Sequence, residues 1–422
     1  MSLKRVRGTE DLKEESQLKH NFIVETAREA ARRFYFQEIS TPILEFTEIF
    51  SRTLGVESDI VNKEMFTFKD RNQEEITLRP EVTAGVARHF ITEKLHQHLP
   101  LRFFYQGPSF RYERPQKGRL RQFHQVGIEL LGEPSPRGDI ECISLACLFF
   151  QKLGIEKELT LEINSIGDLE SRTQHREALL SYLKPLKNKL SEDSQRRLKT
   201  NPLRILDSKE EQDKELIQSA PSIQDFLNKR SKTFFEDVLK GLDALNIPWK
   251  QNSLLVRGLD YYNHCVFEFK SSHEKMGSQN TVLAGGRYDR LIEIMAGEGE
   301  RVYGVGWGAG IERIRFLIQD YPSFPRPIAL VPLGEEAENL ALKLAWQLRQ
   351  EGLIVFHPRA MSNLSKKMKR ASQMRAKYAL IFGPEEVKNE TLSIKNMDTQ
   401  TQKPIPVSQA LSFFKEKLSD KA

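Results

Sequence analysis

Residues 101–132 read "LRFFYQGPSFRYERPQKGRLRQFHQVGIELLG". Two runs rich in aromatic and aliphatic residues, 101–113 and 121–132, flank the basic loop "RPQKGRLR", which holds a proline and a glycine. Such runs on either side of a turn-forming loop predict a β-hairpin. The stretch therefore predicts two neighbouring antiparallel strands, and the rest of the fold is expected to extend from them.

The same kind of pattern recurs elsewhere in the chain. Residues 64–79, "EMFTFKDRNQEEITLR", predict a second hairpin around a polar turn, and strands are predicted at 159–164 and 251–257. Apolar residues at helical spacing predict an amphipathic helix over about residues 15–37. A succession of hairpins with helices between them predicts an α+β fold, in which helices flank an antiparallel sheet.

Changes in composition along the chain divide it into parts. Residues 169–248 are dense in charge and helical in pattern, which predicts a helical insertion between two parts of one larger domain, 1–168 and 249–320. The proline-rich segment "YPSFPRP" follows as a linker. Residues 327–422 begin with an alternation of strand, helix, strand, helix and strand, which is typical of a separate small α/β domain.

Length and composition limit the functions that the chain can have. A chain of 422 residues needs two or three cores, and 29% charged with 39% hydrophobic residues is a globular balance. The net charge of +6 permits a polyanionic partner without requiring one. The N-terminal residues are polar, and no apolar run approaches the roughly 18 residues that span a bilayer, so we expect a cytoplasmic protein without a membrane partner. Cys142, Cys147 and Cys265 form no Cys-x-x-Cys pair, so no structural metal is predicted.

Three arginines stand at the ends of predicted strands or at the start of a predicted helix: Arg111, Arg257 and Arg313. A guanidinium binds phosphate oxygens through two parallel hydrogen bonds, and a buried one is costly unless an anion meets it. The nearby segment "GVGWGAG" at 304–310 would let a ligand approach the backbone closely. The alternatives remain open at this point: glycines also allow tight strand–helix packing, and a strand arginine often pairs with a neighbouring glutamate.

The order of several motifs resembles one family. "FRYERPQKGRLRQFHQVGIELLG" at 110–132 resembles motif 2 of class II aminoacyl-tRNA synthetases, and specifically of the histidyl-tRNA synthetase family. The strand end at Pro42 resembles motif 1, and "GVGWGAGIERI" at 304–314 resembles motif 3. The segments "RGTED", "TLRPEVTAGVAR", "NPLRILDSK", "LVRGLDYYN" and "AGGRYDRL" also resemble segments of that family. The likeness runs from residue 6 to about residue 400.

The resemblance implies a ligase with a catalytic domain of two parts, a helical insertion and a C-terminal α/β anticodon-binding-like domain. The histidine carboxylate would attack the α-phosphorus of ATP, which releases pyrophosphate, and the histidyl group would then pass to the 3′ end of tRNA(His). The implied partners are L-histidine, ATP as substrate with Mg²⁺, tRNA(His) and a second copy of the chain, because motif 1 forms the subunit interface of a homodimer in this class.

The resemblance also assigns residues to roles. Arg111 and Arg257 would be the catalytic cations at the α-phosphate. The histidine-binding residues would be Glu81, Thr83, Arg111, Gln125, Glu129, Arg257, Tyr261 and Tyr262. The ATP-binding residues would be Arg111, Glu113, Arg119, Phe123 and Arg313. Gln116 and Arg121 would meet the tRNA acceptor stem. For Tyr261, packing in the core is an equally weighted alternative, because neighbours on a strand point to opposite faces.

A basic run near the C-terminus has two interpretations. Its members are Arg359, Lys366, Lys367, Lys369, Arg370, Arg375 and Lys377. Leu364, Met368 and Ala371 would bury the other face of the helix, and the run would be a solvated surface or a contact for tRNA. Two alternatives to the whole assignment remain: the non-catalytic regulatory subunit of ATP phosphoribosyltransferase, and a synthetase for proline, threonine or glycine.

Overall fold

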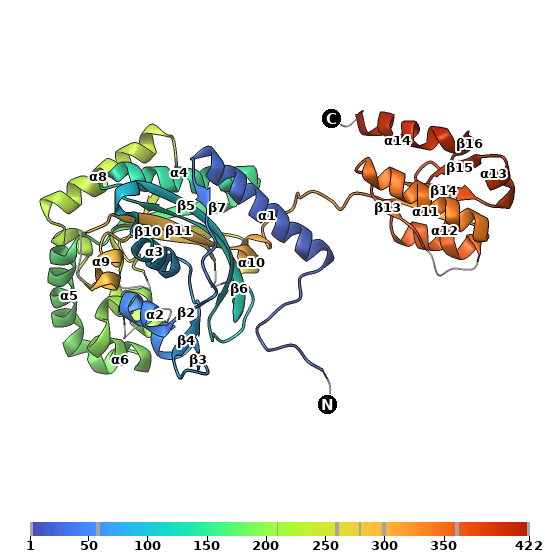
Figure 1. The fold of residues 1–422 in the computed structure, drawn as a ribbon. Helices are drawn as coiled ribbons and strands as arrows, with labels where there is room; N and C mark the ends of the chain where they lie inside the picture. The colour runs from blue at the N-terminus through green and yellow to red at the C-terminus, as the bar shows by residue number, and fades with distance from the viewer. Residues whose placement is uncertain are drawn as a thin grey trace. The chain divides into compact units, whose positions relative to one another are not determined.

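The structure, a computed structural model, describes residues 3–55, 60–208, 210–257, 261–277, 280–297, 301–358 and 363–419. The chain divides into two compact units, Met1–Pro322 and Ser323–Ala422, and each has its own hydrophobic core (Figure 1). No helix within these described ranges is long and apolar enough to cross a membrane.

A large sheet forms the centre of the first unit. Its strands, in spatial order, are β1 (Gln37–Glu38), β5 (Leu101–Phe110), β6 (Gln122–Leu131), β11 (Gly304–Gly310), β10 (Thr281–Arg287), β9 (Asn263–Ser271), β7 (Leu159–Ser165) and β8 (Lys250–Gln251). All neighbours are antiparallel except the short edge strands β1 and β8. The predicted hairpin at 101–132 is confirmed as β5 and β6, and the predicted strand at 159–164 is confirmed as β7.

The prediction of a strand over 251–257 is wrong beyond its first residue. Asn252 Oδ1 accepts a hydrogen bond from the backbone of Leu254 at 3.1 Å, and the backbone of Leu255 donates to the Asn252 carbonyl at 2.9 Å. Asparagine competes in this way with the hydrogen bonds of a sheet. The chain therefore turns at Asn252, and Arg257 reaches the sheet from a loop.

Three helices cover one face of the large sheet: α1 (Glu14–Arg33), α4 (Pro136–Lys152) and α8 (Lys229–Ala244) (Figure 1). The predicted helix over 15–37 is confirmed as α1 and ends earlier, because Tyr35 adopts a left-handed φ of 62°. Ser135 caps α4 by accepting from the backbone of Arg137 at 3.3 Å, and Pro136 occupies the first helical position. The sheet side chains that point toward these helices are apolar, among them Val305, Trp307 and Ala309 of β11.

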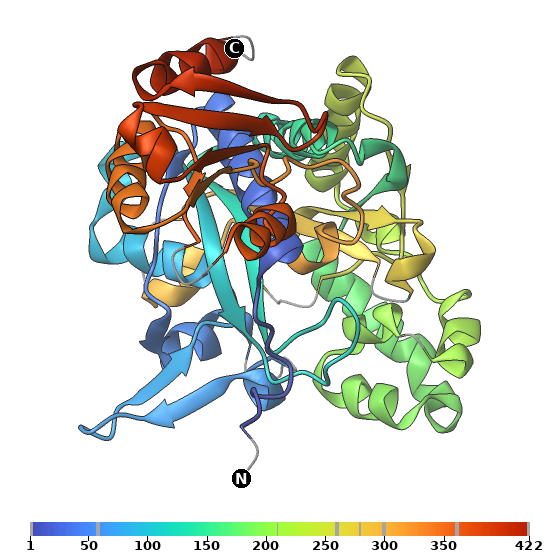
Figure 2. The same ribbon diagram turned by 90° about the vertical axis from the view of Figure 1, so that its right-hand side faces the viewer.

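The other face of the sheet carries a second core. It is formed with α2 (Thr47–Leu54), α3 (Thr83–Thr92) and α9 (Leu291–Ala296). Next to them lies a small sheet with the order β2 (Leu44–Phe46), β4 (Glu75–Leu78) and β3 (Phe66–Lys69). The predicted hairpin at 64–79 is confirmed as β3 and β4 (Figure 2). Asp70 Oδ1 holds its turn by accepting from the backbones of Asn72 and Glu74.

The helical segment after β7 contributes to two different cores. α5 (Leu169–Leu183), α6 (Glu192–Thr200) and α7 (Glu211–Ile217) form a small core of their own with the 3₁₀ turns between them. Buried Asp213 joins them by accepting hydrogen bonds from Ser191, Ser194 and Ser208. α8 packs on the large sheet instead, so the limits of the insertion remain a prediction.

The second unit is a five-stranded sheet with the order β13 (Val355–Phe356), β12 (Ile328–Pro332), β14 (Tyr378–Phe382), β15 (Thr391–Asn396) and β16 (Gln402–Pro406). Its helices are α11 (Glu335–Gln350), α12 (Leu364–Gln373), α13 (Pro384–Lys388) and α14 (Ala410–Ser419). The predicted alternation of three strands and two helices is confirmed, and these three strands are parallel. The antiparallel pair β15 and β16 was not predicted.

Candidate active site

A cavity of about 410 Å³ lies on the face of the large sheet that α1, α4 and α8 leave uncovered. Arg111, Arg257 and Arg313 all line it, although they stand far apart in the sequence. Arg111 follows β5, Arg257 precedes β9, and Arg313 lies in the short helix α10 (Ile311–Ile314). The other predicted site residues in its lining are Glu81, Thr83, Glu113, Arg119, Phe123, Gln125, Tyr261 and Tyr262. Glu129, Gln116 and Arg121 are not part of it.

Alternate glycines of β11 make room for this site. In the strand pairing, Gly306 stands directly opposite Glu129 of β6, and a Cβ at Gly306 would collide with the Glu129 carboxylate. Gly308, the next residue on the same face, lines the cavity itself. The glycine-rich segment is thus a strand with one apolar face and one nearly bare face. The bare face leaves space for Glu129 and for a ligand.

Arg257 is held at the cavity with part of its hydrogen-bonding capacity unused. Its Nη1 donates to Glu268 Oε1 at 2.6 Å, and its guanidinium carbon lies 5.4 Å from the centre of the Tyr262 ring. Its Nε is buried and has no hydrogen-bond partner among the residues that the structure describes. The pairing with a glutamate, which the sequence left open as an alternative, is therefore present. It does not satisfy the whole guanidinium.

Arg313 and Arg111 are anchored by neutral backbone oxygens. Arg313 donates to the carbonyls of Gly118 at 3.0 Å and Thr281 at 2.6 Å, and Arg111 donates to the carbonyl of Pro80 at 3.0 Å. Burial lowers the pKa of Arg313, and the charge of Arg119 acts in the same direction. Several cations thus line one cavity, where Arg119 repels Arg313 and the carboxylates of Glu113 and Glu268 offset part of that repulsion.

Glu81 and Tyr261 contribute hydrogen-bond acceptors and negative charge to the cavity, in contrast to the arginines. Tyr261 donates to Glu81 Oε2 at 3.0 Å, while Glu81 Oε1 is buried and has no hydrogen-bond partner in the described part of the chain. Burial raises the pKa of Glu81, and the charge of Arg111 opposes that rise. The expectation that Tyr261 and Tyr262 point to opposite faces is wrong: both line the cavity, with ring centres 4.6 Å apart. They precede β9 rather than lie in it, so strand alternation does not apply to them.

Glu129 is buried beside the cavity. Its Oε1 accepts from Thr83 Oγ1 at 2.6 Å, and its Oε2 accepts from the Tyr288 hydroxyl. Burial raises the pKa of Glu129 to about 8. Tyr288 had no assigned role in the sequence, although it stands in the segment "AGGRYDRL". The lining residues Tyr105 and Glu268 were missed as well, and neither stands in a motif that would have revealed it.

The loop between β5 and β6 extends from the cavity to the surface. Glu113 pairs with Arg119, and both line the cavity. Gln116 is exposed, whereas Arg121 is folded back, with its guanidinium carbon 3.7 Å from the centre of the Tyr112 ring. The backbone of Arg121 also donates to the Gly8 carbonyl at 2.7 Å, which ties the N-terminal segment to this loop.

The basic run in the second unit differs from its prediction. Arg359 lies outside the described residues. Lys367 is buried and donates to the Pro332 carbonyl at 2.7 Å and to Glu338 at 2.6 Å, so it is not part of a solvated surface. Leu364, expected to be buried, is exposed, because α12 turns Lys367 and Ala371 inward.

A second cavity of about 680 Å³ shares Tyr261 and Tyr262 with the first. Its lining includes Arg172 and Arg176 of α5, together with Arg290 and Arg301. None of the arginines Arg111, Arg257 and Arg313 reaches it. The chemistry that the three arginines indicate therefore belongs to the smaller cavity.

The central sheet is mostly antiparallel. One arginine follows a hairpin strand, another lies in the helix after a glycine-rich strand, and both line one cavity. This combination defines a class II aminoacyl-tRNA synthetase. The profile of the family Histidyl-tRNA synthetase matches residues 8–314, and that of the Anticodon binding domain matches residues 328–417. The chain belongs to the histidyl-tRNA synthetase family.

Individual relatives agree with this assignment. The histidine–tRNA ligase of Rhodospirillum rubrum is 50% identical over 414 residues, covering 98% of this chain and 99% of the relative. That of Wolbachia pipientis is 51% identical over 405 residues, covering 96% and 98%. The crystal structure of apo S. aureus histidyl-tRNA synthetase superposes with a TM-score of 0.82 at 33% identity, covering 98% of this chain and all of that one. The chain is a histidine–tRNA ligase, and its substrates are L-histidine, ATP and tRNA(His).

Proposed function

We propose that the cavity of about 410 Å³ in the first unit binds histidine and ATP side by side, and that Arg111 and Arg257 stabilise the activation step. One observation carries the proposal: three guanidinium groups meet in this cavity, and one of them, Arg257, keeps a buried Nε without a hydrogen-bond partner. A buried donor without a partner is costly, so a ligand oxygen is the natural group to satisfy it.

The cationic end of the cavity suits a triphosphate. Arg111 and Arg257 hold the α-phosphate, and Arg313 holds the γ-phosphate. Glu113 and Phe123 seat the adenine, with Phe123 stacking on the base, and Arg119 lies near the phosphates. Burial is the main cause of the lowered pKa of Arg313, and phosphate charge would offset the additional repulsion from Arg119. Mg²⁺ would accompany the phosphates of ATP, and the Glu268 carboxylate in the lining of the cavity is the kind of oxygen ligand that this ion prefers.

The acidic end of the cavity suits histidine. Glu81 and Thr83 receive the α-ammonium group, and the buried free oxygen of Glu81 gives that charge a partner. Arg111 and Arg257 neutralise the histidine carboxylate, and Gln125 and Tyr261 complete the contacts. Glu129 and Tyr262 read the two ring nitrogens. Amino acids without ring nitrogens would leave these buried polar groups unpaired, which is a strong basis for rejecting them.

The chemistry follows from this placement. A histidine carboxylate oxygen forms a bond to the α-phosphorus, the bond from that phosphorus to the bridging oxygen breaks, and pyrophosphate leaves. The charge that develops on the α-phosphate faces guanidinium groups that are already in position. The terminal ribose hydroxyl of the tRNA then attacks the carbonyl carbon and loses its proton, and AMP leaves. Gln116 and Arg121 of the motif 2 loop meet the acceptor stem in this second step.

Arg257→Ala tests the proposed role in histidine-dependent ATP–pyrophosphate exchange. We expect kcat to fall by about 10²–10³-fold, because a fixed cation at the developing charge is lost, with a smaller change in the KM for ATP. Arg257→Lys should recover only part of the rate, because an ammonium cannot make two parallel hydrogen bonds. An unchanged exchange rate in Arg257→Ala would remove this residue from the mechanism.

The active form is proposed to be a homodimer. The small sheet exposes large apolar side chains: Leu44 is 52%, Phe46 48% and Phe68 46% accessible. These residues follow or neighbour the motif 1 strand end, the part of the chain that forms the subunit interface in this class. A second copy that covered them would remove exposed apolar area and form a self-complementary interface.

A further inference from the structure

We propose that Tyr288 is a positioning residue for histidine selection: its hydroxyl, together with that of Thr83, holds the Glu129 carboxylate in one orientation as an acceptor for the histidine ring. Neither Glu129 nor Tyr288 is among the described residues that line the cavity, but Glu129 is hydrogen-bonded to the lining residue Thr83, whereas the Tyr288 hydroxyl is hydrogen-bonded to Glu129. We therefore assign Tyr288 a role that acts through Glu129. The inference rests on the proposed role of Glu129 in reading the imidazole.

The two hydroxyls hold Glu129 from two sides. Thr83, the first residue of α3, donates to Oε1 at 2.6 Å, and Tyr288, just after β10, donates to Oε2. Gly304 and Gly306 of β11 are both needed for this contact between Tyr288 and Glu129. A Cβ at Gly306 would collide with Glu129, and a Cβ at Gly304 would collide with the Tyr288 ring. The strand thus leaves space for the two side chains in the places where they meet.

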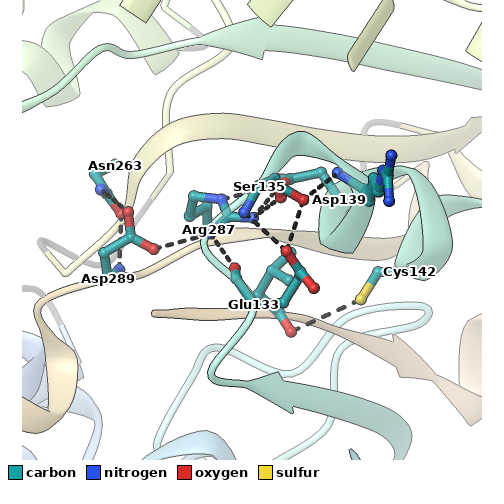
Figure 3. Close-up of polar contacts among 9 residues, drawn as sticks. Glu133, Ser135, Asp139, Cys142, Asn263, Arg287 and Asp289 are labelled. Carbon is teal, nitrogen blue, oxygen red and sulfur yellow. Dashed lines mark hydrogen bonds and ion pairs between the residues drawn. The ribbon is translucent and has the colours of Figure 1, made fainter. Parts of the chain in front are cut away.

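Arg287 and Asp289, the two sequence neighbours of Tyr288, fix its position through hydrogen bonds that point away from Glu129. Arg287 is fully buried and donates to Asp139, to the carbonyls of Glu133 and Ser135 at 2.9 Å each, and to Asp289 at 3.1 Å (Figure 3). Asp289 accepts from Asn263 Nδ2 at 2.9 Å, and its backbone donates to Asn263 Oδ1 at 2.9 Å.

This network joins three parts of the fold. It connects the start of α4, the end of β10 and the first residue of β9, which directly follows Tyr262. Arg287 and Asp289 point into the network, and Tyr288 between them points to Glu129. The segment "AGGRYDRL" therefore has a physical role: Arg287 and Asp289 hold the backbone in place through the network, and the Tyr288 hydroxyl between them is directed to Glu129.

The hydroxyl has an electrostatic consequence as well as a steric one. Burial raises the pKa of Glu129 to about 8, while hydrogen bonds from Thr83 and Tyr288 favour the charged carboxylate. Among the described residues, the titratable groups with a main electrostatic coupling to this carboxyl are Glu81, Tyr105, Cys142, Tyr261, Tyr262 and Tyr288. Loss of the Tyr288 hydroxyl would raise the pKa of Glu129 further and reduce its ionised fraction near neutral pH.

The test compares Tyr288→Phe and Glu129→Gln with Tyr182→Phe. Tyr182 is a matched control, because its hydroxyl also donates one hydrogen bond, to the Leu216 carbonyl at 2.9 Å, but in the insertion. Kinetics of histidine-dependent pyrophosphate exchange would be measured with the full-length enzyme from about pH 6 to about pH 9. Thermal unfolding of each variant would be measured alongside.

We expect Tyr288→Phe to raise the KM for histidine about tenfold near neutral pH, with the KM for ATP within about twofold of the parent value. The KM for histidine should recover as the pH rises, because the carboxylate ionises above its pKa, and the midpoint of that recovery should lie at higher pH than in the parent. In the double variant Tyr288→Phe with Glu129→Gln, loss of the hydroxyl should add nothing to the effect of Glu129→Gln. Tyr182→Phe should change none of these values.

The other possible kinetic results would contradict either the role of Glu129 or that of Tyr288. If Glu129→Gln leaves the KM for histidine unchanged, the assignment of Glu129 itself fails. If Glu129→Gln raises it and Tyr288→Phe does not, the positioning role of Tyr288 alone fails. A rise in Tyr288→Phe that is equal at every pH, or that adds fully to that of Glu129→Gln, would indicate a packing role and would overturn the inference.

Discussion

Two arginines, the fully buried Arg287 and the partly buried Arg257, show how a functional group differs from a structural one. All three nitrogens of Arg287 donate to protein oxygens, and its side chain is inaccessible. Arg257 has one glutamate partner and a buried Nε with no partner. The sequence alone gives both as an arginine near a strand with glycines beside it, so it cannot distinguish them. The distinction depends on which distant residues surround each guanidinium.

The structural arginine should contribute mainly to stability. Arg287→Ala leaves Asp139 buried without its cation, and we expect the free energy of unfolding to fall by about 3–5 kcal/mol. Arg290→Ala is the control, because Arg290 pairs with Glu293 on the surface and should cost about 1 kcal/mol or less. Urea unfolding followed by circular dichroism measures both. Equal losses in the two variants would mean that the buried network adds no stability.

Helices and strands could be predicted from the sequence where residues close to them in the chain determine their structure. The hairpins β3–β4 and β5–β6 follow from short alternating runs around their own turns, so the sequence suffices for them. The end of β8 was missed because one asparagine side chain redirects the chain at Asn252. The role of β11 was only partly foreseen. Its glycines face Glu129 and Tyr288, and that placement depends on pairing with β6 and β10, which are distant in sequence.

The small sheet β2–β4–β3 leads to a prediction about assembly. If its exposed apolar side chains face a second copy, Phe46→Asp places a charge in that interface and should convert a dimer into a monomer. Phe324→Asp is the control, because Phe324 is also exposed, at 64%, but lies at the start of the second unit, in the proline-rich segment 321–327. Light scattering coupled to gel filtration gives the mass of each. A parent protein with the mass of one chain, or a dimer that tolerates Phe46→Asp, would contradict the proposed interface.

At the scale of the whole molecule, each unit has one part of the function. The first unit contains the cavity and all the residues proposed for histidine and ATP, and the second matches an anticodon binding domain. The order of motifs in the sequence indicated this division and the activity. It did not indicate Tyr288, Tyr105 or Glu268, because their places depend on the packing of β5, β9 and β10 around β6 and β11.

Arg111, Arg257 and Arg313 are proposed to bind one triphosphate together. Diffraction from crystals of the enzyme with ATP and histidinol, which lacks the attacking carboxylate, tests this arrangement directly. We expect the α-phosphate within hydrogen-bonding distance of both Arg111 and Arg257, the γ-phosphate on Arg313, and the imidazole on Glu129. Phosphates bound in the larger cavity beside Arg172 and Arg290, with Arg257 still held only by Glu268, would contradict it.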